Sequence, residues 1–417
     1  MNRTVSGCAI MVLVERVTGT PVEVQSYGTD ATLLSELRAA WPVPGASSVA
    51  IEGYRSTDLE GLDLGGAVRL TDRLGVALAA EPGGSFASVP VVLDDGRWRR
   101  ALPGDGMSAF VAGAPMASER PIGVDQTHES VVVGERAIVK WFRRVGPGPS
   151  RASLLLAHLA ETGFDGIPAP LGSLAWRSPS GSLLTLAQGD AYLAHARDGW
   201  EWVLERCEAG DAGVGRELGE AVASLHRALA MPSSVIEHPV GRAEREELGR
   251  WRAAALATMD EALALTGDAE LESWVGPMRA VVDAVEARSV PIQPVHGDLH
   301  VGQVLAWSGG LAFIDFDGNP TLSDAANAIV QARERDIAQM LTALDHVGRV
   351  IEERGDGDRS SWIAETRAGF LAAVGPVDDV LLAAFEVEQE CRELVYSARF
   401  LPRWRYAPTA TLRARFG

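Results

Sequence analysis

The feature that most constrains this chain is a pair of polar segments near residue 300. Residues 296–303 read HGDLHVGQ, and residues 314–318 read IDFDG. Gln303 follows Asp298 by five residues, and Asp315 follows Gln303 by twelve. Two apolar runs around the turn residues 308–310 lie between the segments and predict a β-hairpin. Such a hairpin would return Asp315 towards the loop that contains Asp298.

These three polar side chains match the needs of phosphoryl transfer from ATP. That reaction requires a carboxylate that orients the acceptor hydroxyl and two oxygen ligands that hold Mg²⁺ on the phosphates. Asp298 is predicted to be the catalytic carboxylate, and Gln303 and Asp315 the magnesium ligands. The same five-residue step separates the base from the metal-binding asparagine in protein-kinase catalytic loops, where an Asp-Phe pair also follows. A His-Gly-Asp turn alone is more often only structural, but here two spacings agree.

Length and composition bound the remaining possibilities. The 417 residues exceed what one hydrophobic core usually supports, so two or three domains are expected. The formal net charge of −18 argues against a nucleic-acid partner, because phosphate backbones are bound by dense Lys and Arg surfaces. No stretch approaches the ~20 apolar residues of a membrane span. Three widely spaced cysteines form neither a disulfide framework nor a zinc pattern, and no secretory signal is evident, so a cytoplasmic protein is expected.

The chain divides into three segments by pattern. Residues 1–112 contain short β-type runs at 48–51, 67–70 and 91–93 and are predicted to form an N-terminal cap domain. Residues 113–190 are predicted to be a nucleotide-binding lobe, and residues 191–417 a helical lobe with the catalytic and acceptor sites. Whether the first segment is a separate domain or adds strands to the nucleotide lobe stays open.

The predicted nucleotide lobe contains one lysine on an apolar strand. Residues 130–142 read SVVVGERAIVKWF, a hairpin whose second strand holds Lys140. A lysine there needs a partner for its charge, and ATP phosphates are suitable, although an edge-strand lysine facing solvent is the alternative. The preceding segment is not glycine-rich, so the hydroxyls of Thr127 and Ser130 are predicted to contact phosphate. The predicted adenine-binding hinge, acting through its backbone, is Ala187, Gln188 and Gly189.

One element of the kinase pattern is missing from the predicted helix at residues 149–163. In protein kinases, a glutamate on this helix pairs with the strand lysine. Here the helix contains no acidic residue before Glu161. Either Glu161 reaches the lysine or the pair is absent, and its absence would suit a pseudokinase that binds ligands without turnover.

We refer to residues 296–303, which contain Asp298, as the catalytic loop. The acceptor pocket is expected between this loop and the C-terminal helices. One helix is predicted from about residue 323 to 345, with Ile337, Leu341 and Leu344 on its buried face, and another near residues 385–400. Each helix also has polar residues in line along one face, and a face that is simply solvated is the alternative explanation for them. The residues predicted to contact the acceptor are Asp298, His300, Asp317, Gln331, Asp336, Glu393, Tyr396 and Trp404.

Taken together, several segments resemble the maltokinase-like branch of the aminoglycoside-phosphotransferase-type kinases. The resemblance covers roughly residues 120–410, and it is carried by residues 133–144, 197–201, 225–229, 296–303 and 314–318. It implies an α+β fold that is bilobal and protein-kinase-like, preceded by an N-terminal β-rich cap. It also implies an enzyme that uses ATP and Mg²⁺ to phosphorylate a soluble sugar. The branch includes maltokinases and bacterial glucosamine kinases.

The chain departs from the maltokinase pattern near the expected acceptor site. Maltokinases continue FEGEP after the metal-binding aspartate, whereas residues 316–320 here read FDGNP, and residues 322–336 also differ. The cap is also shorter. With the acidic charge balance, these differences favour a small cationic acceptor such as glucosamine, giving glucosamine 6-phosphate. A maltokinase, an aminoglycoside phosphotransferase and a non-catalytic pseudokinase are the alternatives.

Overall fold

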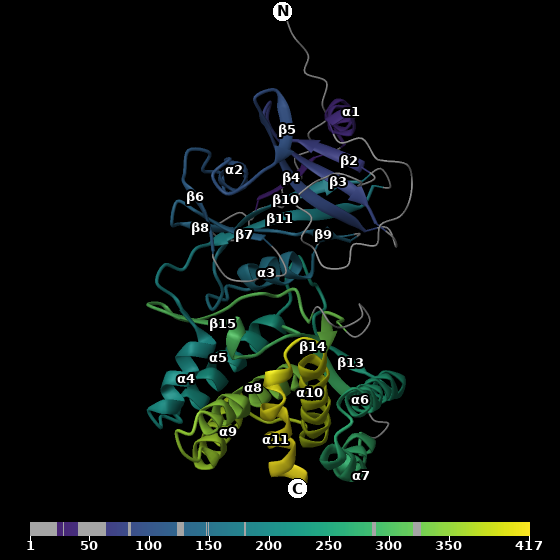
Figure 1. Ribbon diagram of the computed structural model, residues 1–417, viewed down its shortest axis with the longest axis vertical. Coiled ribbons are helices and arrows are strands. Elements are labelled where there is room, and N and C mark those ends of the chain that lie inside the picture. The colour runs from purple at the N-terminus through teal and green to yellow at the C-terminus, as the bar shows by residue number, and fades with distance from the viewer. Residues whose placement is uncertain are drawn as a thin grey trace, which may run out of the picture. The chain divides into compact units, whose positions relative to one another are not determined.

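The chain folds into two compact units in the computed structural model, shown in Figure 1. The first unit comprises Met1–Ala157 and Pro168–Ala194, and the second comprises His158–Ile167 and His195–Gly417. The residues that the structure describes are 23–27, 29–40, 64–81, 85–122, 129–146, 148, 150–178, 181–285, 289–319 and 327–417. Within these ranges, no helix is long and apolar enough to cross a membrane.

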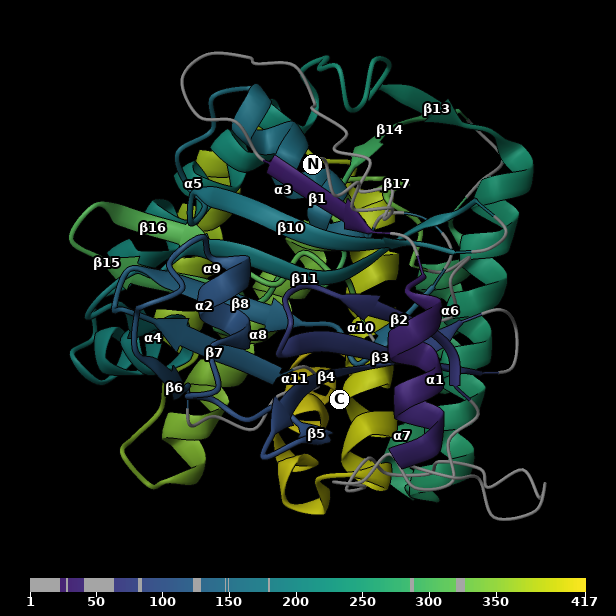
Figure 2. The ribbon, with the colours of Figure 1, turned by 90° about the horizontal axis from the view of Figure 1, so that it is seen from above.

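The first unit contains two β-sheets. In the six-stranded sheet the order is β1-β10-β11-β8-β7-β6, and β1, β10 and β11 lie side by side in Figure 2. Its strands are β1 (Glu23–Tyr27), β6 (Glu119–Pro121), β7 (Glu129–Val133), β8 (Ala137–Trp141), β10 (Pro170–Arg177) and β11 (Leu183–Ala191). The second sheet comprises β2 (Leu64–Arg69), β3 (Leu74–Ala80), β4 (Phe86–Asp94), β5 (Arg97–Arg100) and β9 (Arg144–Val145). The helices are α1 (Ala31–Ala40), α2 (Met107–Val111) and α3 (Arg151–Glu161), whose last four residues belong to the second unit.

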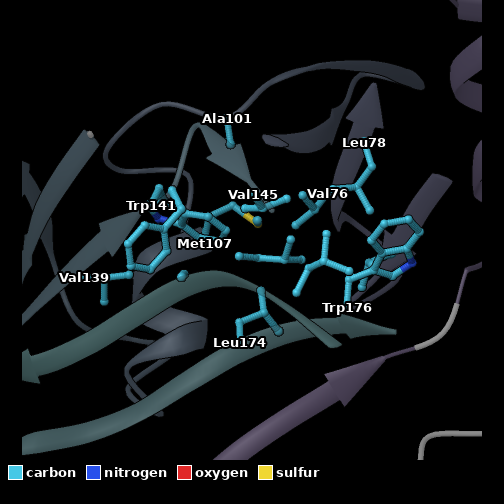
Figure 3. Close-up of a cluster of buried hydrophobic side chains, with 14 of the residues drawn as sticks. Val76, Leu78, Ala101, Met107, Val139, Trp141, Val145, Leu174 and Trp176 are labelled. Atoms are coloured by element: carbon cyan, nitrogen blue, oxygen red, sulfur yellow. The ribbon is translucent and has the colours of Figure 1, made fainter. Parts of the chain in front are cut away.

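One hydrophobic core joins strands from both sheets of the first unit (Figure 3). It contains Val76 and Leu78 from β3, Val139 from β8, and Leu174 and Trp176 from β10. These strands come from both sides of the boundary predicted at residue 112. The contacts therefore favour additional strands packed on the nucleotide lobe, one of the two arrangements that the sequence left open. The exact boundary stays a prediction, and the β-type run at 48–51 lies outside the described residues.

The second unit is mainly helical. Its helices are α4 (Gly199–Glu208), α5 (Gly213–Leu229), α6 (Arg245–Thr266), α7 (Ala269–Asp283), α8 (Glu334–Glu353), α9 (Ser360–Val374), α10 (Asp379–Arg399) and α11 (Tyr406–Phe416), with short 3₁₀ turns η2 (Val301–Gln303) and η3 (Pro402–Trp404). One small sheet has the order β12-β15-β16 and another β13-β14-β17. Their strands are β12 (Arg197–Asp198), β13 (Gly241–Ala243), β14 (Val290–Pro294), β15 (Val304–Trp307), β16 (Gly310–Phe313) and β17 (Val330–Gln331).

Helix α8 is central to the second unit, but its predicted start was wrong. Ile337, Leu341 and Leu344 are buried, as their helical spacing predicted. The helix begins only at Glu334, eleven residues after the predicted start at 323. Immediately before it, β17 pairs with β14. The chain is therefore an extended strand in a region where the sequence pattern predicted a helix. Strand pairing with a distant segment thus overrides the local helical periodicity.

Candidate active site

The predicted hairpin brings the two polar segments of the second unit together. Strands β15 and β16 pair from Val304 opposite Phe313 to Trp307 opposite Gly310, which confirms the hairpin. Beyond its open end, the Ile314 N–H donates to the Gln303 carbonyl at 3.0 Å. His296 closes the arrangement through a 2.9 Å contact between its Nε2 and the Ile314 carbonyl oxygen. The backbone next to Asp315 is thereby held beside Gln303 and the catalytic loop.

The catalytic loop also depends on close packing against α4. A Cβ atom at Gly199, the first residue of α4, would lie 2.2 Å from the Val301 carbonyl oxygen and 2.4 Å from that of Val304. Only glycine allows this approach, because no real side chain tolerates such distances. Asp198 caps the helix by accepting hydrogen bonds from the N–H groups of Trp200 and Glu201. The start of α4 therefore fixes the turn η2, which ends at Gln303.

Asp298 is partly buried at the edge of a pocket, where one described side chain donates a hydrogen bond to it. Its Oδ1 accepts a hydrogen bond from Asn319 Nδ2 at 2.9 Å, and its Oδ2 lies 4.0 Å from His300 Nε2. Burial raises the pKa of the Asp298 carboxyl above its ordinary value. His300, His296 and the Asn319 amide favour the charged form and oppose this rise, whereas the charge of Asp315 adds to it. The carboxylate is thus more basic than a solvated aspartate, as suits a proton acceptor.

Gln303 and Asp315 form a donor set that fits Mg²⁺. Gln303 is half-buried and Asp315 is exposed, with a left-handed φ of 61°. Together they offer one amide oxygen and one carboxylate. Mg²⁺ is usually held by one or two carboxylates together with phosphate oxygens and water. No cluster of three or more His, Cys, Asp or Glu side chains suited to a metal occurs among the described residues, so nucleotide phosphates would have to supply further ligands.

The underside of the catalytic loop is held by two buried side chains of α8. Asp336 accepts hydrogen bonds from the His296 N–H at 2.9 Å and the Gly297 N–H at 2.8 Å, and it contacts His226 Nε2 at 3.0 Å. Gln339 accepts from the Leu299 N–H at 3.0 Å. Asp336 is fully buried and does not line the pocket, so the substrate contact predicted for it is wrong. Its full set of donors makes it a support for the loop.

Two other predicted acceptor residues also lie away from the pocket. Gln331 is 3% exposed, and its Nε2 donates to the Ala328 carbonyl at 2.8 Å, within the segment where β17 pairs with β14. Asp317 is half-buried, and its carbonyl accepts from Asn327 Nδ2. Neither residue lines the pocket beside Asp298. Gln331 is instead bonded within its own segment, and the backbone of Asp317 is part of a local turn.

A pocket of about 790 Å³ extends from Asp298 through the second unit. Its walls are a stripe of α8, a stripe of α10, Trp200 of α4 and the segment around η3. The predicted acceptor residues that line it are Asp298, His300, Glu393, Tyr396 and Trp404. The structure therefore brings five of the eight predicted residues into one cavity, although their contact with an acceptor stays a prediction.

Glu393 is held in the pocket wall by two hydrogen bonds. Trp404 Nε1 donates to its Oε2 at 3.0 Å, and Gln389 Nε2 donates to its Oε1 at 3.1 Å. The Trp404 ring packs edge-on against His346, with centroids 5.6 Å apart. Burial alone would lower the pKa of His346, but the Glu390 carboxylate at 2.9 Å raises it to about 9. The charge of Glu393 also contributes to this rise of the His346 pKa.

In the first unit, Lys140 lies on β8 between two neighbouring strands. It is opposite Ser130 of β7 and Gln188 of β11, so the three side chains share one face of the sheet. Gln188 is buried; it accepts a hydrogen bond from Ser153 Oγ of α3 and donates one to Asp190. Thr127, predicted to contact phosphate, lies outside the described residues.

The predicted adenine hinge at Ala187, Gln188 and Gly189 is wrong for its backbone role. These residues lie within β11, which pairs with β10 on one side and with β8 on the other. Both edges of a central strand are used by the ladder, so its N–H and C=O groups are not available to adenine. A hinge that binds through its backbone must lie after the strand ends at Ala191.

The carboxylate of Glu161 is hydrogen-bonded within the second unit, and a pairing with Lys140 stays a prediction. Glu161 Oε1 accepts from the Ser234 N–H at 2.7 Å and its Oε2 from the Ser234 hydroxyl at 2.8 Å, both within the second unit. Its carboxylate therefore serves to attach the end of α3 to the loop after α5. On α3, Ser153 donates a hydrogen bond to Gln188 of β11, the strand that pairs with β8 beside Lys140.

Comparisons with known proteins agree with this geometry. Residues 120–319 match the model of the phosphotransferase enzyme family. A glucosamine kinase of Streptacidiphilus jiangxiensis is 35% identical over 78% of this chain and 84% of its own. One from Mycolicibacterium smegmatis is 33% identical over 86% of this chain and 98% of its own. The chain belongs to this glucosamine kinase family.

Solved structures confirm the predicted fold class for this kinase. A glucosamine kinase crystal form B is 31% identical, covers 93% of this chain and 97% of its own, and has a TM-score of 0.76. A glucosamine kinase in complex with glucosamine, ADP and inorganic phosphate is likewise 31% identical, with a TM-score of 0.74 over 93% and 99% of the two chains. The α+β, protein-kinase-like fold is confirmed.

Sequence reasoning missed two residues of the kinase site, Asn319 and Gln339. Asn319 holds Asp298, and Gln339 holds the backbone of the same loop while also lining the pocket. For Asn319 a signal existed, because FDGNP at residues 316–320 departs from the maltokinase FEGEP at this position. Nothing comparable marks Gln339, since its partner is forty residues away in sequence.

Proposed function

We propose that this chain is an ATP- and Mg²⁺-dependent kinase that transfers the γ-phosphoryl group to glucosamine, giving glucosamine 6-phosphate. The observation that carries the proposal is the placement of two carboxylates in one pocket. Asp298 lies in the catalytic loop, and Glu393 lies in the wall formed by α10. Both similar enzymes named above are glucosamine kinases, and one similar structure holds glucosamine with ADP.

Each carboxylate suits a different part of this acceptor. In glucosamine the amine on C2 lies across the ring from C5, which carries the C6 hydroxymethyl group. A ring with its 6-hydroxyl at Asp298 therefore directs its ammonium group away from the catalytic loop, into the pocket. Each oxygen of Glu393 accepts one hydrogen bond from the protein and keeps a further lone pair for the ammonium. Trp404, hydrogen-bonded to Glu393, offers an apolar ring face to the sugar.

The transfer step follows from the geometry of the catalytic loop. Asp298 orients the acceptor hydroxyl and takes its proton as the new O–P bond forms and the bond to ADP breaks. Gln303 and Asp315 would hold Mg²⁺, which neutralises phosphate charge when bound. Lys140, with the hydroxyl of Ser130 on the same sheet face, would contact the phosphates. These roles are assigned from residue chemistry and from each unit considered by itself.

A screen of acceptors tests the proposal. ATP consumption should be measured with glucosamine, glucose, N-acetylglucosamine, maltose and an aminoglycoside at matched concentrations. A site built around an ammonium–carboxylate contact leaves its carboxylate unpaired with the neutral analogues, so glucosamine should exceed them at least about tenfold in kcat/KM. Fastest turnover of maltose or of the antibiotic would refute the acceptor assignment. ATP binding without turnover of any acceptor would instead indicate a pseudokinase.

A further inference from the structure

The acceptor pocket is longer than one sugar requires. The residues of α8 that line it are Gln339, Thr342, Ala343, His346, Val350 and Glu353, followed by the C-cap Arg354. Their spacing of three or four residues places them on one continuous stripe of the helix. From Gln339 to Glu353 the helix rises about 21 Å, at roughly 1.5 Å per residue. A single pyranose ring is much shorter than this stripe.

The two ends of the stripe differ in burial. At the end beside Asp298, Gln339 and Thr342 are buried. At the other end, Glu353 and Arg354 are exposed, so the pocket opens to solvent there. Trp404 lies between, linked to Glu393 by its hydrogen bond and to Tyr406 by an edge-on ring contact with centroids 6.0 Å apart. We refer to the open part, lined by Val350, Glu353, Arg354 and Tyr406, as the distal pocket.

The distal pocket has the chemistry of a sugar subsite. Tyr406 supplies an aromatic wall beside Trp404, and Val350 is an apolar side chain on the opposite helix. Glu353 has no salt bridge among the described residues, whereas Arg354 is paired with Glu208 at 3.3 Å. Glu353 and Tyr406 both line this end of the pocket; burial and the Glu353 charge raise the pKa of Tyr406, and the Arg354 charge opposes this rise. One unpaired carboxylate therefore faces the aromatic end of the cavity.

We propose that the distal pocket binds a second ring, so that the kinase phosphorylates glucosamine residues carrying a substituent on the anomeric oxygen. This inference rests on the proposed function. With the 6-hydroxyl at Asp298, C1 lies on the side of the ring that points away from the catalytic loop. A substituent on C1 thus extends towards Trp404 and Tyr406. The favoured acceptor is a short amino-sugar oligosaccharide, whose second ammonium group is placed to meet Glu353.

The test compares glucosamine with its β-1,4-linked disaccharide as acceptors for the intact enzyme. We expect kcat/KM for the disaccharide to equal or exceed that for glucosamine, with phosphate on the ring that keeps its 4-hydroxyl. Glu353→Gln should lower the disaccharide value about two- to fivefold, as for an exposed charge pair, and leave glucosamine unchanged. Glu272→Gln is the matched control, because Glu272 is an exposed glutamate of α7 outside the pocket.

The outcomes separate this inference from the proposed function. A disaccharide that reacts less than about a tenth as well as glucosamine would refute the second ring site. So would a loss in Glu353→Gln that is equal for the two acceptors, or no loss with the disaccharide. If glucosamine itself is not phosphorylated, the proposed function fails, whatever the disaccharide does.

Discussion

Two aspartates, the partly exposed Asp298 and the fully buried Asp336, lie on opposite sides of the catalytic loop, and their environments differ. On the pocket side, Asp298 accepts one hydrogen bond from a side chain in the part of the chain that the structure describes, that of Asn319. On the underside, Asp336 is surrounded by His226 and two backbone N–H groups. Burial alone would raise the pKa of both. It does so for Asp298, but hydrogen bonds from His226 and the loop backbone hold the pKa of Asp336 below its ordinary value.

The difference distinguishes a carboxylate that supports the structure from one that can react. A carboxylate that accepts three hydrogen bonds is stabilised in its charged form and has little capacity left for a proton. A partly buried carboxylate such as Asp298 retains lone pairs for a substrate hydroxyl, and its partial burial makes it more basic. Sequence alone predicted both residues to contact the acceptor, because both are acidic and near the same motif. Only the donors that surround each one separate the two roles.

The largest effect should follow from Asp298→Asn. The variant loses the proton acceptor but keeps the shape of the side chain, so kcat should fall by roughly 10²- to 10⁴-fold, the usual range for a general base. Thermal stability and ATP binding should change little. Single-turnover kinetics and nucleotide titration measure these quantities. Retention of more than a few per cent of activity would show that Asp298 is not the reacting carboxylate.

Asp336→Asn should show the opposite pattern to Asp298→Asn: its main effect should be a loss of folding stability and not a direct loss of catalysis. The amide places a donor among groups that already donate, and breaking such a buried charged network costs roughly 3–5 kcal/mol. The pKa of Asp336 is lowered in the folded protein. Its contribution to the free energy of unfolding is therefore present above the ordinary aspartate pKa and is lost as the pH falls. Denaturant unfolding at neutral and acid pH should therefore show the two proteins converging in acid. A constant difference at all pH values would contradict this.

The candidate metal ligands should behave like Asp298, with loss of activity and little loss of stability. Asp315 contributes a charge and Gln303 only a dipole, so Asp315→Ala should be more damaging than Gln303→Ala. Raising the Mg²⁺ concentration should restore the glutamine variant more fully. Activity measured across a magnesium titration provides the comparison. Equal losses without rescue would argue against both assignments.

The smallest effect should come from Asn319→Ala. The Asn319 amide favours the charged form of Asp298, so its removal should raise the pKa of Asp298 further. The acid limb of the kcat/KM profile should then move to higher pH, while activity on the alkaline side falls less than about tenfold. An acid limb that stays in place would mean that this limb reports another group.

The sequence predicted the local structure around the candidate catalytic and metal-binding residues, because that structure depends on short-range contacts. The steps from Asp298 to Gln303 and Asp315 are fixed by one loop and one hairpin, and both elements form as expected. The missed features depend on contacts between distant segments. Gln339 reaches a loop forty residues away, and the start of α8 is set by pairing between β14 and β17. The adenine hinge was misplaced for the same reason, since pairing on both sides of β11 cannot be read from its own residues.

The left-handed backbone of Asp315 has a consequence for how this protein balances stability against activity. A residue with a side chain at φ 61° is less stable there than glycine, at a cost on the order of 1 kcal/mol. Asp315→Gly should therefore melt at a higher temperature than the native protein while losing its activity. A less stable residue at this position is consistent with the proposed role of Asp315 as a magnesium ligand, because glycine has no side chain to bind a metal. Variants selected for heat resistance alone would tend to lose catalysis here first.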